Sequence, residues 1–173
     1  MLRFLTSAFI VLLMLGCQPA PPAADGDVST SSEPVTIFLV RHAEKAEYGT
    51  KDPPLTAAGA ARAARLRDML LAADIEHIYS TDYQRTRQTA QPLADTLDLS
   101  VATYPPFDST FITSLPERHA GQHILLTGHS NTIPATVNHL TGSSYGDLQE
   151  MEYDKLFVVN GQEGNWSVVR LRY

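Results

Sequence analysis

The sequence is poor in cysteine, with Cys17 alone among 173 residues. One cysteine excludes an internal disulfide, and no Cys/His cluster has zinc spacing, so we expect neither a metal nor a cofactor. Positive charge is also scarce, because 13 Lys and Arg residues against 19 Asp and Glu residues give a formal net charge of −6. This balance argues against nucleic acid as a partner. Any anion must therefore be bound by a few local cations.

The apolar run Phe4–Leu15 is shorter than the ~20 residues that span a membrane as a helix. It follows a short positive start and precedes small residues, which is the order of a secretory signal peptide, so residues 1–16 are assigned to one. Its end, Met14-Leu15-Gly16-Cys17, resembles the lipobox of bacterial lipoproteins, in which the cysteine is lipidated and becomes the new N-terminus. This resemblance predicts an exported protein on the periplasmic side of a bacterial membrane, anchored through a lipid on Cys17.

Gln18 follows the cysteine, and in such lipoproteins a residue other than Asp there favours the outer membrane. The alternative is a plain signal peptide or a short retained anchor, with Cys17 incidental. Residues 17–34 are rich in Pro, Ala, Gly and Ser and predict a disordered tether. Residues 35–173 remain for one folded domain, and a hydrophobic fraction of 43% is enough to form its core.

The domain alternates between strand and helix patterns. Val35–Val40 is a continuous apolar run that predicts a strand buried on both faces. Further strands are expected at 75–79, 99–103 and 123–127, and a hairpin at 156–160 and 166–171. Helices are expected from Thr56 to about Ala73, from a cap at Thr81 or Asp82, within 109–119, and from near Thr132. The pattern predicts a three-layer α/β/α fold with a mostly parallel central sheet and a C-terminal β-hairpin at its edge.

Polar residues follow three of these strands, and ligands bind beyond the carboxyl ends of strands in such sheets. The three segments are Arg41-His42-Ala43-Glu44-Lys45, Ser80 to Ala90, and Gly128-His129-Ser130-Asn131-Thr132. They bring two histidines and several arginines to one end of the sheet. Arginine orients a phosphate bidentately, and an imidazole can attack phosphorus, so this set suits phosphoryl transfer.

The ordered motifs resemble those of the histidine phosphatase superfamily, the phosphoglycerate-mutase-like fold. Arg41-His42 matches the family's Arg-His-Gly with Ala43 in place of glycine. The Leu-Thr-x-x-Gly and Ser-x-x-x-x-Arg-x-x-Gln-Thr-Ala motifs match the segments from Leu55 to Gly59 and from Ser80 to Ala90, and Gly-His matches Gly128-His129. The resemblance implies that His42 is a nucleophile forming a phosphohistidine. It also implies that Arg41 and Arg85 clamp the phosphate and that His129 completes the pocket.

The general acid is not specified by these motifs. Hydrolysis of an ester requires a proton for the leaving oxygen. Asp108, in the loop after the third strand, is the first choice; Glu44, also placed among the substrate-binding residues, is the second. With neither in place, substrates with good leaving groups would be favoured. Lys45 and Arg87 are expected to be solvated charges.

The resemblance predicts a small exported phosphatase that needs no metal. Its substrate would be a small phosphomonoester or a phosphohistidine, including one on a phosphoprotein. The alternative is a non-catalytic periplasmic binding protein for phosphorylated ligands, which would keep the arginines but not require the nucleophile.

Overall fold

The structure is a computed structural model that describes residues 33–47 and 49–173. The predicted signal peptide, Cys17 and all but the last two residues of the tether lie outside the described residues. The strands are β1 (Val35–Arg41), β2 (Ile75–Ser80), β3 (Val101–Thr103), β4 (His123–Gly128), β5 (Lys155–Gln162) and β6 (Asn165–Arg172). The helices are α1 (Ala57–Leu70), α2 (Gln84–Leu97), α3 (Ser109–Arg118) and α4 (Thr132–Thr141).

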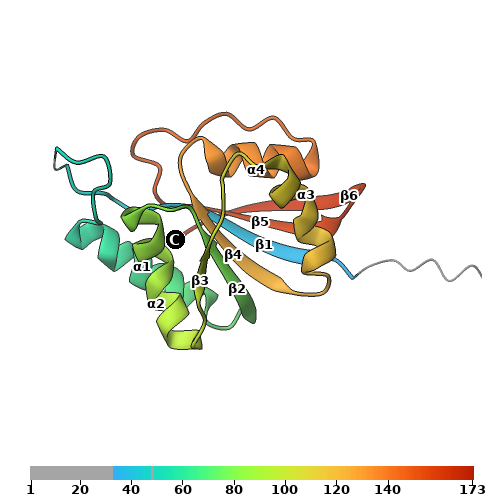
Figure 1. The fold of residues 1–173 in the computed structure, drawn as a ribbon, viewed down its shortest axis with the longest axis horizontal. Helices are drawn as coiled ribbons and strands as arrows, with labels where there is room; N and C mark the ends of the chain where they lie inside the picture. Colours follow the sequence, from blue (N-terminus) through green and yellow to red (C-terminus); the bar gives the residue numbers. More distant parts are fainter. Residues whose placement is uncertain (1–32, 48) are drawn as a thin grey trace, which may run out of the picture. The chain divides into compact units, whose positions relative to one another are not determined.

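The six strands form one sheet in the order β3-β2-β4-β1-β5-β6 (Figure 1). The first four are mutually parallel, β5 runs antiparallel to β1, and β6 runs antiparallel to β5 at the edge. The mostly parallel sheet and the C-terminal hairpin at its edge are therefore confirmed.

The sheet is covered on both faces, which makes the domain three layers thick. Ile37 and Leu39 of β1 pack in one core with α3 and α4. The next residue, Val40, packs in the other core with α1 and α2, because successive side chains of a strand point to opposite faces. Each fully buried Leu or Ile contributes about 1.5–3 kcal/mol of transfer free energy, so the apolar run in β1 stabilises both layers.

The N-cap residues predicted for α1 and α2 can be compared with the observed ones. Thr56 caps α1 as predicted, and its hydroxyl accepts a hydrogen bond from the Gly59 amide at 3.0 Å, although the helix ends at Leu70 and not near Ala73. The predicted cap of α2 at Thr81 or Asp82 is wrong, since Tyr83 is the N-cap residue and makes no side-chain cap bond. The reason is that Thr81 bonds elsewhere and Asp82 pairs with Arg87.

The helices that follow the neighbouring strands β1 and β4 lie on opposite faces of the sheet. β1 leads to α1 on one face, whereas β4 leads to α4 on the other, and their ends are aligned by the pairing of Arg41 with Gly128. Such a switch point opens a crevice at the carboxyl ends of the strands. In the described part of the chain, no helix has both the length and the apolar character needed to cross a bilayer.

Candidate active site

Four of the predicted residues meet at this switch point. Arg41 ends β1 and His42 follows it, His129 follows β4, and Arg85 lies in the first turn of α2. All four line one cavity of about 410 Å³. The His42 amide donates to the Gly128 carbonyl at 2.8 Å, so the loops that carry the two histidines are fastened together.

His42 is buried and has a defined tautomer. Its Nδ1 lies 2.8 Å from the Ala43 carbonyl oxygen, which can only accept, so Nδ1 carries the proton and Nε2 keeps its lone pair. Burial lowers the pKa of His42 to about 3, with a smaller lowering from Arg41, Arg85 and His129 that the Ala43 hydrogen bond opposes. At neutral pH the ring is therefore uncharged and Nε2 carries a lone pair.

His129 faces His42, with ring centroids 5.5 Å apart. Its Nε2 lies 3.0 Å from the Thr81 hydroxyl, which donates in turn to the Thr86 hydroxyl. Burial, followed by the positive charges of Arg85 and Arg41, lowers the pKa of His129 to about 4. The positive charge between the rings is thus supplied by arginines, while both imidazoles are neutral.

Arg41 is 3% exposed, and the segment between α4 and β5 fixes its side chain. Its Nη1 donates to the carbonyl oxygens of Gln149 and Glu150 at 2.8 and 3.0 Å, and its guanidinium lies over the Tyr153 ring at 4.2 Å. Within the described residues its buried Nε has no hydrogen-bond partner. That N–H is free to donate to an anion in the cavity.

Arg85 supplies the second guanidinium. Its Nη2 lies 3.5 Å from His129 Nδ1, its Nη1 lies 3.7 Å from an Asp52 carboxylate oxygen, and its charged end stacks over Tyr83 at 4.3 Å. Nε and Nη1 are buried and lack a hydrogen-bond partner among the residues described. Because Arg85 lies in the first turn of α2, the positive end of that helix also favours an anion here.

Small residues of the motifs let the loops approach closely. Gly59 packs on the Glu44 backbone, where an added Cβ would collide with the Glu44 carbonyl oxygen, and at Gly128 a Cβ would come within 2.7 Å of the Thr132 hydroxyl. Ala43 is fully buried and its φ is not positive, so the loop accepts alanine where the family has glycine. The Ala43 amide donates to the Thr89 hydroxyl at 2.9 Å.

The structure does not bring Asp108 or Glu44 to the wall of this cavity. Asp108 is the N-cap of α3, and its carboxylate accepts from the amides of Thr110 and Phe111 at 2.9 and 3.3 Å. Glu44 is bound bidentately by Arg62, with contacts of 2.7–3.0 Å. Although burial opposes it, hydrogen bonding from Arg62 holds the pKa of Glu44 below its ordinary value.

Other cavity residues were missed or misjudged by sequence reasoning. Lys45, expected to be a solvated charge, lies in the cavity wall. Arg87 lies outside that wall, is partly exposed and pairs with Asp82. The wall also includes the carboxylate residue Glu150 and the exposed ring of Phe107. No sequence motif marks Glu150, because it lies in a segment without regular secondary structure, more than 100 residues from Arg41.

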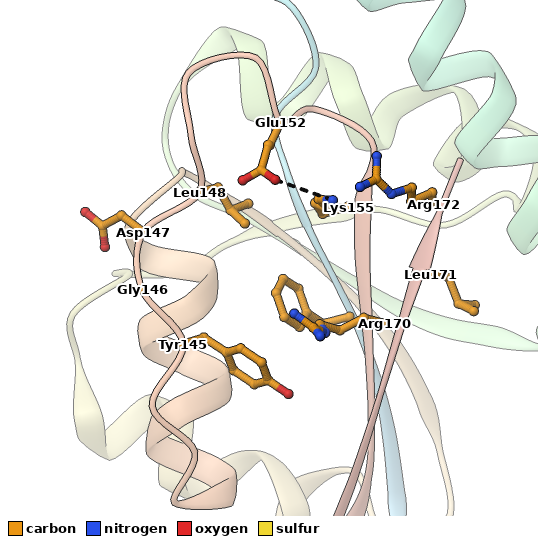
Figure 2. A pocket seen from close by; sticks show the side chains of 10 residues that line it. Tyr145, Gly146, Asp147, Leu148, Glu152, Lys155, Arg170, Leu171 and Arg172 are labelled. Carbon is orange, nitrogen blue, oxygen red and sulfur yellow. Dashed lines mark ion pairs between the residues drawn. The ribbon is translucent and has the colours of Figure 1, made fainter.

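A second cavity, of about 500 Å³, lies between β5, β6 and the chain that follows α4 (Figure 2). Arg170 points into it from β6 and lies 5.3 Å from the Tyr145 ring, and at its upper rim Lys155 pairs with Glu152 at 3.4 Å (Figure 2). It contains no histidine and none of the motif residues. The candidate catalytic residues thus lie in the first cavity, and both cavities are lined in part by the segment 142–154.

The first cavity can bind and attack a phosphate-like anion. It presents guanidinium N–H groups without partners, a lysine, and an imidazole whose free Nε2 is a competent nucleophile. Among the described residues, no three His, Cys, Asp or Glu side chains gather as a metal site.

Comparison with known proteins agrees with a phosphate-binding site. The model of the histidine phosphatase superfamily (branch 1) matches residues 37–108. Two proteins named probable phosphoglycerate mutase GpmB are similar to part of the chain: one from Yersinia enterocolitica is 39% identical over 75 residues, and one from Enterobacter sp. is 33% identical over 89 residues. These matches cover 40% and 48% of this chain, and the chain spans only 35% and 41% of the two relatives.

Solved structures share the fold over most of the chain. The protein histidine phosphatase SixA complexed with tungstate superposes with a TM-score of 0.67 at 21% identity, covering 79% of this chain and 96% of that one. A mycobacterial glucosyl-3-phosphoglycerate phosphatase gives 0.66 at 13% identity, covering 79% and 97%. The fold is thus the α/β fold of histidine phosphatases and phosphoglycerate mutases. The family-model match itself, over residues 37–108, covers less than half of the chain.

Proposed function

We propose that this chain is a phosphatase that hydrolyses phosphomonoesters or phosphohistidine through a covalent phosphohistidine on His42. The observation that carries the proposal is the geometry of His42. Its ring is neutral, its Nδ1 proton is committed to the Ala43 carbonyl, and its Nε2 is left for attack in a cavity with two arginines.

In the proposed first step, the phosphoryl group lies between Arg41, Arg85 and His129 while His42 Nε2 attacks phosphorus. The bond from phosphorus to the leaving group breaks as the N–P bond forms. In the second step water attacks the phosphohistidine and releases inorganic phosphate. The guanidinium groups neutralise charge on the equatorial oxygens, so the proposed reaction requires no metal ion.

Related proteins suggest two substrate classes. SixA is described as a protein histidine phosphatase, and the mycobacterial protein as a glucosyl-3-phosphoglycerate phosphatase. These descriptions support phosphohistidine and phosphomonoesters, respectively, as candidate substrates. A mutase activity is the competing proposal, favoured by the names of the GpmB relatives, but their match is confined to less than half of each protein.

The test is turnover of p-nitrophenyl phosphate at pH 4–8 by the folded domain, with and without EDTA. We expect turnover that survives EDTA and disappears in His42→Ala. His139→Ala is the matched control, because this exposed histidine lies outside the active cavity and bonds to Thr113. Activity retained by His42→Ala, or abolished by EDTA, would contradict the proposal.

We further propose that the phosphatase is an exported lipoprotein anchored through Cys17, with the outer membrane as its destination. The support is the lipobox-like sequence and the cysteine at the end of the apolar run. Expression of the full chain in a double-membraned bacterium with labelled palmitate should label the wild type and not Cys17→Ala. Equal labelling of both would contradict the anchor.

A further inference from the structure

We propose that Glu150 is the proton donor to the leaving group, an assignment that rests on the phosphatase function proposed above. Among the described acidic residues, Glu150 alone lines the active cavity. Its carboxylate Oε2 lies 3.8 Å from Arg41 Nη2, and its side chain is 78% exposed, which puts it at the mouth. It belongs to neither of the loops considered from the sequence, since it lies between α4 and β5.

A residue that protonates the leaving group must lie at the mouth of the cavity. The arginine N–H groups without partners and both imidazoles draw the phosphoryl group to the buried end of the cavity. The ester oxygen and the group attached to it must then extend toward solvent, past Glu150, Tyr83 and Phe107. A carboxyl there meets the bridging oxygen without competing for the position of the nucleophile.

The segment that carries Glu150 is fastened to both histidine loops. The Glu150 and Gln149 carbonyls accept from Arg41, which precedes His42. On the other side the Leu148 amide donates to the carbonyl of Ser130, which follows His129, at 2.9 Å. The backbone of Glu150 is thus positioned by the catalytic loops themselves, while its side chain remains free to reach the substrate.

A turn and an ion pair hold the same segment on its far side. Glu152 accepts from the Gln149 amide at 2.9 Å and pairs with Lys155 at the start of β5, the contact drawn at the upper rim of the second cavity (Figure 2). Gln149 before Glu150 and Glu152 after it are thus both held in place. The place of Glu150 in the mouth therefore follows from the fold of the segment.

Three other carboxylates near the cavity are engaged in contacts of their own. Asp108 caps α3, Glu44 is held by Arg62, and Asp52 accepts from the Gln84 amide at 2.8 Å while lying outside the cavity wall. Transfer of any of these carboxylates to the substrate would break contacts that hold α3, α1 or α2 in place. Among the described residues, the 3.8 Å approach to Arg41 is the only side-chain ion pair or hydrogen bond of Glu150.

The proton balance closes over two steps. The Glu150 carboxyl gives its proton to the bridging oxygen as the P–O bond breaks and the bond from His42 Nε2 to phosphorus forms. The resulting carboxylate then takes a proton from the water that attacks phosphorus, the N–P bond breaks, and phosphate leaves. The carboxyl is regenerated with no other reactant than water.

The test compares two substrates of nearly equal shape, p-nitrophenyl phosphate and phenyl phosphate, whose leaving groups differ in basicity. p-Nitrophenolate leaves without a proton, whereas phenolate needs one. In Glu150→Gln, kcat/KM for phenyl phosphate should fall by about 10²-fold, and for p-nitrophenyl phosphate by less than about tenfold. Asp108→Asn is the matched control, since asparagine also caps helices, and it should leave the ratio of the two substrates unchanged.

Three outcomes would overturn the assignment. Equal losses on both substrates would give Glu150 a structural role, and a gain on both would mean that its carboxylate only blocks Arg41. A wild type that turns over p-nitrophenyl phosphate but not phenyl phosphate would have no working acid. No turnover of either substrate by the wild type would instead overturn the phosphomonoesterase part of the proposed function, on which this assignment rests.

Discussion

At the scale of single residues, the site keeps two imidazoles uncharged by burying them beside arginines. Burial is the main cause of the lowered pKa of both His42 and His129, and the neighbouring positive charges add to it. A bound phosphate dianion would offset those charges and favour the protonated form of His129 as a donor. In the proposed mechanism, the empty and the phosphate-bound site would therefore differ in the protonation of His129.

The same lowering predicts that the free energy of unfolding falls at acid pH. The unfolded chain takes up protons near the ordinary histidine pKa of 6.5, whereas His42 in the folded state does so only near pH 3. Stability is therefore full above about pH 7 and is lost as pH falls between these two values. Each unit of lowered pKa corresponds to about 1.4 kcal/mol, so a loss on the order of 2–4 kcal/mol is expected from His42 between pH 7 and 4.

Urea unfolding at pH 7, 5.5 and 4 measures how much of the free energy of unfolding is lost as His42 takes up its proton. His42→Asn, which removes the titrating ring, should show a clearly shallower decline than the wild type. His139→Gln, at an exposed position, should follow the wild type. An equally steep decline in His42→Asn would contradict the role of burial at this site.

At the scale of elements, the site depends on how closely α1 approaches the loop after β1. Gly59 lies in α1 directly against the Glu44 backbone, and the Thr56 amide donates to the Glu44 carbonyl at 2.8 Å. This contact fixes the loop that begins with His42. The Leu-Thr-x-x-Gly motif therefore has a structural role here, since it attaches the start of α1 to the loop that carries His42.

Gly59→Ala should destabilise the protein although alanine is the better helix former. The gain in helix propensity is about 0.5–1 kcal/mol, but the new Cβ meets a backbone oxygen that cannot move without shifting the loop, and overpacking of this kind costs about 1–3 kcal/mol. We expect a net loss of about 1–2 kcal/mol in urea unfolding, with lower turnover.

Gly49→Ala is the matched control, because nothing lies within 4 Å of the added Cβ. It should leave stability within about 0.5 kcal/mol of the wild type. Stabilisation by Gly59→Ala with unchanged turnover would show that the helix and loop are less tightly coupled than the structure indicates.

The segment 142–154 marks the limit of sequence reasoning at this scale. The motif loops could be predicted because each follows a β-strand, and strand ends in a parallel sheet meet at one edge. The position of Glu150 depends on backbone carbonyls bonding to Arg41 and on the Leu148–Ser130 contact, neither of which leaves a pattern in the sequence. Asp108 shows the converse, since its place after the third strand favours a catalytic carboxylate, whereas Asp-Ser-Thr is a local capping pattern and the structure uses Asp108 as a cap.

At the scale of the whole molecule, the sequence specifies the layers better than the element ends. Val35–Val40 could be recognised as a strand buried on both faces because it is apolar throughout, and both cores do form on it. The alternation of strands and helices then leads to the three-layer arrangement. The start of α2 could not be predicted, because the hydroxyl of Thr81 bonds to His129, a tertiary contact that removes it from capping.

The most direct test of the central claim is to capture phosphate on His42. The protein should be exposed briefly to labelled phosphoramidate, quenched in alkali, digested and examined by mass spectrometry under conditions that preserve phosphohistidine. We predict an alkali-stable, acid-labile phosphate on the peptide containing His42, and none in His42→Ala. Turnover without any such label would contradict the covalent mechanism, and neither turnover nor label would favour a binding protein for phosphorylated ligands.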